Sequence, residues 1–488
     1  MSGTMRAVEP PPSSPPPGRG VFCNRTLNLR AIRAVGFDMD YTLVHYHVDQ
    51  WERRAYEYLL QELHEVGWPV DGLEFPAGFA MRGLVVDTEL GNLVKADRFG
   101  YVKRASHGTR RLGFDEQRQA YARVQVDLSE GRWVFLNTFF SLSEACMYAQ
   151  LVDRLDRGGF GERVLGYADL WGGVRNALDK THAEGRLKAE IVEAPGAYVD
   201  IDPELAPALI DLRDSGKRLL LITNSEWPYT KAMMSFALDR FLPPDGGWRS
   251  LFDLVIVAAR KPEFFSGRLP LFEIASDDGL LRPCVSGPTG PGAYLGGDAA
   301  LVEQYLGLSG SEILYIGDHL NTDVRISKDM RRWRTALIVR ELEEELAAVA
   351  TVREPQERLD ELMAEKARLE FAQAHLRLRV LRAGRVADGP RERVGALESQ
   401  IGRLRAKIER LDDQIGPIAL EVGSIFNDTW GPLMSAGADR SHLARQLEAS
   451  ADIYTSRVSN LVFQTPFAYL RAPRGRMPHD IALERGDD

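Results

Sequence analysis

Two aspartates one residue apart, Asp38 and Asp40, follow an apolar run that starts at Ala34. If this run is a buried strand, both carboxylates emerge at its carboxyl end, the edge of an open α/β sheet where ligands bind. Carboxylates this close repel each other unless a cation lies between them or one holds a proton. Oxygen ligands suit Mg²⁺. The pair predicts a nucleophile, a proton-transfer group and a metal, or else a strand end capped by two solvated acids.

Three further segments place polar residues directly after apolar runs. In the first, hydroxyl and amide groups stand between a strand and a helix, where they could bind an oxyanion or simply cap the helix. In the second, a lysine ahead of a proline could neutralise a phosphate or be an ordinary surface charge. In the third, one carboxylate could ligate Mg²⁺ while another orients the lysine or a metal-bound water. These residues are Thr223, Asn224 and Ser225; Lys261; and Asp318 with Asp323.

Each of these segments has an ordinary explanation when it is taken alone. Together they supply a carboxylate nucleophile, a proton-transfer carboxylate, an oxyanion-binding hydroxyl, a cation and a metal ligand. Phosphoryl transfer needs this inventory, because it depends on charge neutralisation and in-line positioning. An aspartyl-phosphate intermediate would divide the reaction into two steps. The combination therefore favours catalysis over the separate ordinary explanations.

Strands and helices alternate in the part of the chain that carries these residues, which predicts a doubly wound α/β core with a buried parallel sheet. The core is expected to comprise residues 22–50 and 201–354. Residues 266–297 are rich in glycine and proline and predict a loop with a β excursion. The expected elements are a strand within 26–44, a helix at 205–215, a strand at 218–223, a helix at 230–242, and strands at 252–258, 313–317 and 336–339.

The region between the first strand and the rest of the core does not alternate in this way. Residues 51–67 and 115–190 have mainly helical patterns, and residues 78–100 predict a β-hairpin or meander. We therefore expect an inserted, mainly helical cap over residues 51–200.

Residues 355–422 carry two apolar stripes separated by turn residues at 383–390. In the second stripe, steps of three and four alternate from Val394 to Ile418, which is a heptad seam. The pattern predicts an antiparallel coiled-coil hairpin that either packs on itself or supports a homo-oligomer. Residues 423–488 are expected to pack on the core, and the Pro-rich residues 1–21 to form a disordered tail.

The chain has 488 residues, 44% of them hydrophobic, so it can bury a large core in two or three domains. Its net charge of −9 argues against non-specific nucleic-acid binding. Three scattered cysteines (Cys23, Cys146 and Cys284) indicate a reducing, cytoplasmic compartment. No apolar run reaches the ~20 residues that a membrane helix needs, so no membrane association is expected.

The four motifs resemble those of the haloacid dehalogenase-like phosphatases, and the likeness extends to the cytosolic purine 5'-nucleotidases and their relatives. It covers residues 22–480 apart from the heptad hairpin. The segments that carry it are Gly36–Leu43, Arg82–Asp87, Gly91–Lys95, Asp97, Ala259–Pro262, Tyr315–His319 and Trp333–Thr335.

The resemblance implies a role for each motif. Asp38 would attack the phosphate, while Asp40 would protonate the leaving oxygen and then activate water. Mg²⁺ would be held by the Asp38 carboxylate, the Asp40 main-chain carbonyl and Asp318. Thr223 and Lys261 would hold phosphate oxygens. The neighbouring positions Asn224 and Ser225 would assist them, and Asp323 would support the metal site from behind.

The resemblance also implies a base-recognition helix in the cap. Arg175, Asp179 and His182 are spaced i, i+4, i+7 and share one helix face, although a charged outer face would look the same. Arginine and aspartate can bind the oxo and N–H groups of a 6-oxopurine, and an aromatic ring can stack on it. Lys188 and the stacking residue Phe140 also fall on positions that match the family.

Two positions depart from the family pattern. Ala183 replaces a tyrosine beside His182, which puts the base contacts in doubt, and Asn321 replaces an aromatic residue of the family's effector site, which puts nucleotide activation in doubt. We expect a Mg²⁺-dependent 5'-nucleotidase for purine ribonucleoside 5'-monophosphates, IMP or GMP first. The alternatives are a phosphatase of the same fold for another metabolite, or an assembly protein that uses the hairpin.

Overall fold

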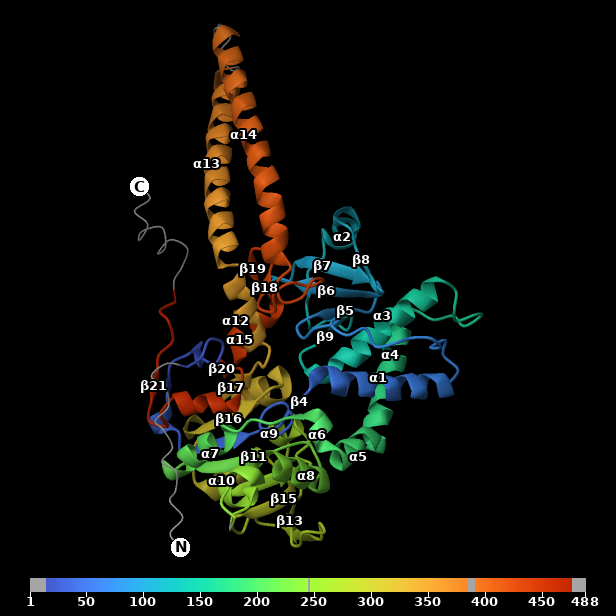
Figure 1. Ribbon diagram of the computed structural model, residues 1–488, viewed down its shortest axis with the longest axis vertical. Helices are drawn as coiled ribbons and strands as arrows, with labels where there is room; N and C mark the ends of the chain where they lie inside the picture. The colour runs from blue at the N-terminus through green and yellow to red at the C-terminus, as the bar shows by residue number, and fades with distance from the viewer. Residues whose placement is uncertain (1–14, 245, 384–390, 476–488) are drawn as a thin grey trace. The chain divides into compact units, whose positions relative to one another are not determined.

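The computed structural model describes residues 15–244, 246–383 and 391–475. It divides into two compact units (Figure 1), one comprising residues up to 343 and from 433 onward, the other residues 344–432. Most of the expected tail and of the turn at 383–390 lies outside the described residues. Within them, no helix has both the length and the apolar character needed to cross a bilayer.

A ten-stranded sheet forms the centre of the first unit within the described residues. The strands from β20 to β15 run parallel to one another. At one edge β1 pairs antiparallel with β20, and at the other β13 pairs antiparallel with both β15 and β14. The predicted α/β core with a parallel sheet is confirmed. The strands, in spatial order, are β1 (Phe22–Cys23), β20 (Ile453–Thr455), β17 (Arg334–Ile338), β16 (Ile313–Gly317), β3 (Ala34–Phe37), β11 (Arg218–Ile222), β12 (Leu254–Val257), β15 (Gly292–Gly296), β13 (Leu271–Ile274) and β14 (Leu281–Cys284).

The inner strands are mainly apolar because the sheet is buried on both faces. Every residue of β3, β12 and β16 is buried. The side chains of these strands pack with aromatic residues such as Phe264, Phe265 and Trp333 into one hydrophobic core. Helices in the same unit include α7 (Leu205–Asp214), α8 (Trp227–Leu238), α9 (Glu263–Ser266), α10 (Ala299–Leu306), α11 (Ile326–Arg331) and α15 (His442–Ser450).

Some elements of the core differ from the expected ones. The first strand is only β3, preceded by β2 (Leu27–Asn28) and a 3₁₀ turn at Leu29–Ala31, and the chain leaves the sheet at Asp38. The Gly/Pro-rich stretch 266–297 contributes β13, β14 and β15, and β15 joins the parallel part of the sheet beside β12. The sequence of β15 is short and has glycine at both ends, so it resembles a loop. At the amino end, Arg19 of the expected tail donates hydrogen bonds to Asn460 and Ser459.

The cap, residues 51–200, contains a sheet as well as helices. A five-stranded antiparallel sheet, counted over the described residues, has the order β8-β7-β6-β5-β9. The expected hairpin corresponds to β5 and β6. The other three strands were not anticipated, because β8 and β9 have only two and three residues and β7 contains the charged pair Lys103 and Arg104. The cap elements are β5 (Val85–Asp87), β6 (Asn92–Ala96), β7 (Val102–His107), β8 (Arg110–Arg111), β9 (Trp133–Phe135), α1 (Val48–Glu65), α2 (Phe114–Tyr121), α3 (Leu142–Asp156), α4 (Tyr167–Glu184), α5 (Arg186–Glu193) and α6 (Pro195–Tyr198).

The two ends of this insertion meet at the core. Strand β4 (His45–Tyr46) precedes α1, and β10 (Val199–Asp200) follows α6; the two strands pair in an antiparallel ribbon. The chain therefore enters and leaves the cap at one place, a few residues after Asp38 and Asp40. This connection brings cap residues near the carboxyl edge of the central sheet.

The second unit consists mainly of α13 (Arg353–Ala383) and α14 (Arg391–Gly423), which pack side by side (Figure 1). The heptad positions of α14 are buried or half-buried, whereas most other positions are exposed. Cross-helix contacts run in opposite directions along the two helices: Lys366 binds Asp412, and Gln373 Nε2 donates to the Ile401 carbonyl. The two helices thus run antiparallel to each other.

Candidate active site

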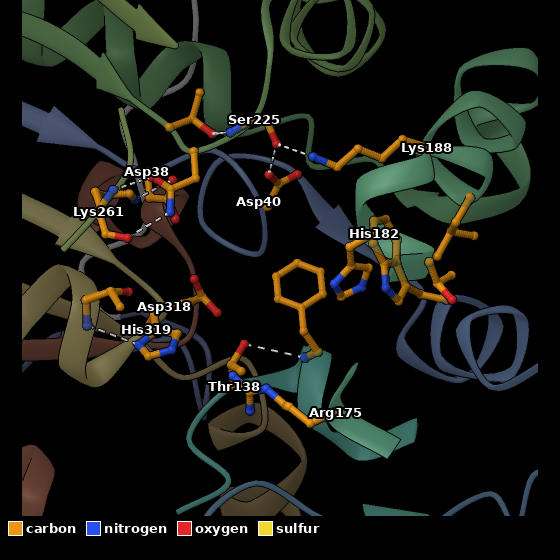
Figure 2. A pocket seen from close by; sticks show the side chains of 18 residues that line it. Asp38, Asp40, Thr138, Arg175, His182, Lys188, Ser225, Lys261, Asp318 and His319 are labelled. Atoms are coloured by element: carbon orange, nitrogen blue, oxygen red, sulfur yellow. Dashed lines mark hydrogen bonds and ion pairs between the residues drawn. The ribbon is translucent and has the colours of Figure 1, made fainter. Parts of the chain in front are cut away.

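The polar residues of the four motifs gather at the carboxyl ends of neighbouring parallel strands. Asp38 directly follows β3, Thr223 follows β11, Asp318 follows β16, and Lys261 lies four residues beyond β12. With cap residues they line a cavity of about 460 Å³ (Figure 2). The residues expected from the sequence that line it are Asp38, Asp40, Phe140, Arg175, His182, Lys188, Thr223, Asn224, Ser225, Lys261 and Asp318.

Lys261 is the cation at the centre of the sheet edge. Its Nζ lies 2.8 Å from Asp38 Oδ1 and 2.6 Å from Asp323 Oδ1, and donates to the Tyr315 hydroxyl at 3.1 Å. These contacts use all three ammonium protons. Burial disfavours the charged lysine, but the charges of Asp323 and Asp38 outweigh it and raise the Lys261 pKa well above its usual range. Lys261 is therefore a fixed positive charge beside Asp38.

The loop that carries Lys261 is held by Asn224. The Asn224 Nδ2 donates to the Lys261 carbonyl at 3.1 Å, and the Lys261 N–H donates to Asn224 Oδ1 at 2.6 Å. The preceding residues Ala258 and Arg260 have positive φ angles of 46° and 57°, a conformation that non-glycine residues seldom adopt. Such strained backbone persists where the surroundings impose it, often at functional sites. In this structure the Asn224 amide thus fixes the lysine loop.

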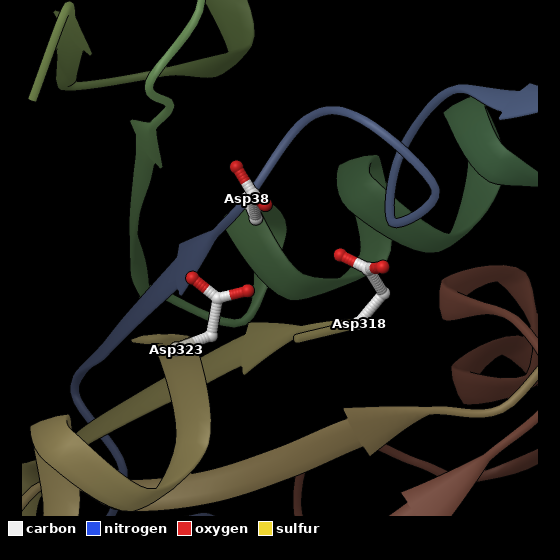
Figure 3. Close-up of side chains that lie close together, drawn as sticks. All are labelled: Asp38, Asp318 and Asp323. Carbon is white, nitrogen blue, oxygen red and sulfur yellow. The ribbon is translucent and has the colours of Figure 1, made fainter. Parts of the chain in front are cut away.

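Asp38, Asp318 and Asp323 form an acidic cluster in which one oxygen of each lies within 4.8 Å of the others (Figure 3). Burial raises the pKa of Asp38 to about 7 despite the opposing Lys261 charge. Burial, together with the Asp323 and Asp38 charges, raises that of Asp318 well above its usual range. Three buried carboxylates thus share one ammonium group, and a divalent cation would relieve this excess negative charge.

The free oxygens of this cluster indicate where a cation would fit. Asp323 is fully engaged: one oxygen contacts Lys261, and the other accepts the His319 N–H at 3.1 Å. Asp318 Oδ2, in contrast, is buried and has no hydrogen-bond partner among the described residues. An orphaned buried carboxylate oxygen is costly unless a cation or water binds it. The residues therefore fit a Mg²⁺ held by Asp38 and Asp318, with Asp323 behind them.

Gly317 allows this arrangement. A Cβ atom at this position would lie 2.5 Å from Asp323 Oδ2 and 2.6 Å from the Asp323 Cβ. Any side chain would push Asp323 away from Lys261. The glycine before Asp318 is thus required for the acid behind the cluster to approach the sheet.

Asp40 is held apart from the lysine cluster (Figure 2). Its Oδ1 accepts the Tyr46 hydroxyl at 2.5 Å, and its Oδ2 accepts the Ser225 hydroxyl at 2.7 Å. Ser225 Oγ in turn accepts a hydrogen bond from Lys188 Nζ, a cap residue, at 3.1 Å. Thr223 Oγ1 accepts the Ser225 N–H at 3.0 Å. The two aspartates of the first motif thus have different partners and can perform different tasks.

The opposite wall of the cavity comes from the cap. The Phe140 ring lies 4.9 Å from the Tyr41 ring and 5.4 Å from the Trp51 ring. Arg175 and His182 of α4 line the cavity (Figure 2). Phe140 lines it as well. Asp179, on the same helix, is exposed and does not line the cavity. The structure therefore combines an aromatic face with an arginine and a histidine opposite the acids.

Several cavity residues were not singled out from the sequence. His319 ends a segment quoted for the resemblance, and Thr138 lies two residues before Phe140, so their position in the sequence was the available signal. Trp51, Thr181 and Leu187 carry no chemical signature that separates them from core residues. Tyr46, which binds Asp40 although it does not line the cavity, has none either. Only the fold brings these residues to the site.

A parallel sheet that gathers an aspartate pair, a lysine and a second acid pair at its carboxyl edge defines a haloacid dehalogenase-like phosphoric monoester hydrolase. Comparison with known proteins narrows this class. A model described as the 5' nucleotidase family matches residues 21–482, and the chain belongs to this family.

Among curated proteins, the chain is 28% identical over 477 residues to a 5'-nucleotidase domain-containing protein of Dictyostelium discoideum, covering 95% of this chain and 75% of the relative. It is also 28% identical over 343 residues to human 5'-nucleotidase domain-containing protein 1, covering 64% of this chain and 73% of the relative. Among solved structures, an archaeal β-phosphoglucomutase from Pyrococcus sp. strain ST 04 shares 11% identity with a TM-score of 0.31, covering 63% of this chain and 87% of that chain.

Proposed function

We propose that this protein is a Mg²⁺-dependent 5'-nucleotidase that hydrolyses purine ribonucleoside 5'-monophosphates, IMP and GMP first, through an aspartyl-phosphate intermediate. The observation that carries the proposal is the cavity itself. It has Asp38, Asp40 and Lys261 on the sheet side, and Phe140 and Arg175 on the cap side. This arrangement suits a phosphate ester with an aromatic, hydrogen-bonding group.

In the first step an Asp38 carboxylate oxygen attacks phosphorus, and the bond between phosphorus and the leaving 5'-oxygen breaks. Asp40 gives its proton to that oxygen, so the nucleoside leaves as a neutral alcohol. Thr223 holds one non-bridging phosphate oxygen, and Lys261 holds another by exchanging its contact with Asp38 for the phosphate. The charge of these oxygens spreads in the transition state. Mg²⁺, bound by Asp38 and Asp318 with the Asp40 carbonyl, would neutralise part of that charge.

In the second step Asp40, now ionised, takes a proton from water. The water oxygen attacks phosphorus, and the bond to Asp38 breaks, which releases inorganic phosphate and restores both carboxyl groups. Asp323 keeps Lys261 in place during both steps through its 2.6 Å ion pair. At the other end of the substrate, Phe140 offers a ring for stacking on the base, and Arg175 offers donors to a purine oxo group. The free cysteines Cys23, Cys146 and Cys284 suit a cytoplasmic enzyme, because disulfides are rare in that reducing compartment.

A phosphate-release screen tests the proposal. Purine and pyrimidine nucleoside monophosphates are compared with sugar phosphates, in Mg²⁺ and after chelation by EDTA. We expect the highest kcat/KM with IMP or GMP and loss of activity in EDTA. Phosphate release from sugar phosphates alone would contradict the nucleotidase assignment. Phosphate release that EDTA does not reduce would contradict the Mg²⁺ requirement.

The Asp38→Asn variant tests the nucleophile. It removes the attacking carboxylate but keeps the size of the side chain, so kcat should fall by about 10⁴ or more. An unfolding curve measured in parallel shows whether the variant is folded. Substantial turnover by folded Asp38→Asn protein would exclude Asp38 as the nucleophile.

A further inference from the structure

The Asp40 carboxylate is held by two hydroxyl groups that come from different parts of the fold. Ser225 follows β11 of the core, while Tyr46 belongs to β4, at the entry to the cap. The Tyr46 hydroxyl makes the shorter contact, 2.5 Å against 2.7 Å for Ser225. The Ser225 hydroxyl donates to Asp40 and accepts from Lys188, so it links the acid to the cap. Tyr46 makes the shorter of the two contacts with Asp40.

Tyr46 has little freedom to move. Its side chain is buried, and its ring packs 5.2 Å from Tyr41 and 4.6 Å from Trp51. Its backbone pairs with Val199 of β10 in the ribbon that closes the insertion. Packing on two rings and pairing in a ribbon both restrict the rotamer, so the phenol presents its hydroxyl at one place.

A second tyrosine supports the first. The hydroxyls of Tyr46 and Tyr229 are 3.0 Å apart, and Tyr229 is a buried residue of α8. A phenol has one proton to donate. When Tyr46 gives its proton to the ionised Asp40, the contact between the phenols is made by the Tyr229 proton. The hydrogen bonds then run from Tyr229 to Tyr46 to Asp40, and each one orients the next.

We propose that Tyr46, supported by Tyr229, is a positioning residue that fixes the Asp40 carboxylate for proton transfer to the leaving oxygen. The inference rests on the acid role that the proposed function gives to Asp40. The protonated Asp40 carboxyl group can rotate about its Cβ–Cγ bond, yet it must direct its proton at the leaving oxygen. Small misplacements of the carboxyl group are costly in rate. Two donors on opposite oxygens remove that rotation, whereas Ser225 alone would leave it.

The leaving group provides the sharpest test. An alkyl phosphate releases a strongly basic alkoxide, so it depends on the acid, whereas an aryl phosphate such as p-nitrophenyl phosphate releases a stable phenolate without it. The value of kcat/KM covers binding and the first chemical step, so hydrolysis of the phosphoenzyme does not mask the effect. A positioning role predicts a loss confined to alkyl esters, while general damage to the fold would affect both esters equally.

The experiment measures kcat/KM of Tyr46→Phe, with Mg²⁺, for glycerol 2-phosphate and for p-nitrophenyl phosphate. A hydrogen bond to a charged group affects rates by about tenfold to a hundredfold. We expect a loss of that size with the alkyl ester and less than about threefold with the aryl ester, mainly in kcat. Tyr229→Phe should show the same selectivity with a smaller loss, and it remains a test if Tyr46→Phe does not fold. Equal losses with both esters, or no loss, in the folded variants would overturn the proposal.

Two reference variants complete the design. Tyr167→Phe removes a phenol that donates to a carboxylate, Asp156, at 2.8 Å, but outside the cavity, and both rates should be unchanged. Asp40→Asn should show the strongest preference for the aryl ester. If it lost both esters equally, the acid role itself would be wrong, and the positioning role would fall with it. Neither ester is a nucleotide, so a failure of the purine assignment stays distinct from a failure of this inference.

Discussion

The two walls of the cavity are built in different ways. On the sheet side, Asp38, Lys261 and Asp318 are buried, and Lys261 has a carboxylate on each side at 2.8 and 2.6 Å. On the cap side, the Arg175 side chain is 52% exposed, and its ion pair with Glu144 is long, at 3.6 Å. His182 is exposed as well. One wall is thus a closed network, and the other is a loosely held set of polar groups.

This difference matches what each wall has to do. Stabilising the charge of a phosphoryl group works best with charges fixed in advance in a site from which water is excluded. Recognition of a base can proceed with side chains that become ordered when the ligand arrives, at a cost in affinity. The comparison leads us to expect that changes at the sheet wall affect turnover and stability, while changes at the cap wall affect binding.

A large effect on both stability and turnover should follow from Lys261→Met. This change leaves Asp38 and Asp323 buried without their shared cation, and breaking a buried ion pair in this way costs about 3–5 kcal/mol of stability. It also removes the fixed charge beside the transferring phosphoryl group, so we expect kcat to fall by about 10³. The rate is measured with p-nitrophenyl phosphate, and the stability by urea unfolding.

Lys217→Met is the matched control for this change. Lys217 is also buried, but its Nζ donates to the Leu29 and Ile32 carbonyls at 2.7 and 2.8 Å, away from the cavity. The control should lose stability and keep its kcat. If Lys261→Met retained a tenth of the wild-type kcat, the sheet wall would not be the closed catalytic network described above.

A smaller effect, confined to binding, should follow from Arg175→Met. Loss of one charged donor to the base corresponds to about a tenfold rise in KM for GMP or IMP. The kcat/KM for p-nitrophenyl phosphate, which lacks a purine, should not change. The measurement is the ratio of the two substrates in wild type and variant.

Lys180→Met serves as the control on the same helix. Lys180 forms an ion pair with Glu62 and does not line the cavity, so its removal should leave both substrates unaffected. If Arg175→Met slowed both substrates equally, the cap wall would contribute to catalysis rather than to recognition of the base.

The same contrast explains what could be predicted from the sequence. Asp38, Thr223 and Asp318 each follow a continuous apolar run, because a strand buried on both faces needs one. The run locates the strand end, and the residue type supplies the chemistry. Lys261 stands four residues beyond its strand, yet the same reasoning reached it.

Tyr46 and Tyr229 could not be found in this way. Tyr46 binds Asp40, and Tyr229 binds Tyr46, only because β4 leads into the cap while α8 follows β11. An isolated tyrosine looks like any core aromatic. Strands β15, β7 and β8 escaped for a related reason: strands of two to six residues containing glycine or charged residues leave no clear alternation. Local patterns thus predicted the sheet wall well, and the tertiary contacts behind it poorly.

The smallest effect on turnover is expected at Glu52 of α1, a buried carboxylate of the cap. Among the described residues no lysine or arginine forms an ion pair with it; its Oε2 accepts the Ser143 N–H at 2.7 Å. Burial, and to a lesser extent the Glu144 charge, raises the pKa of Glu52 to about 8 from its ordinary 4.5, against the Ser143 hydrogen bonds. Unlike the acids at the sheet wall, Glu52 avoids an uncompensated charge by holding a proton.

A carboxyl group whose pKa is higher in the folded chain than in the unfolded chain contributes to stability. This contribution is fully present below the pKa of the unfolded chain. Between about pH 4.5 and about pH 8 the folded chain holds a proton that the unfolded chain has lost, so stability falls as the pH rises. The slope is at most about 1.4 kcal/mol per pH unit.

Glu52→Gln should remove this part of the pH dependence and leave kcat within about twofold of wild type. Thermal unfolding midpoints measured from pH 5 to pH 8 test this, and a shift of a few degrees is expected. Glu65→Gln, at an exposed position of the same helix, should follow the wild-type curve. If the Glu52→Gln and wild-type curves were parallel, Glu52 would be ionised in the folded cap, and the cap would need a cation as the sheet wall does.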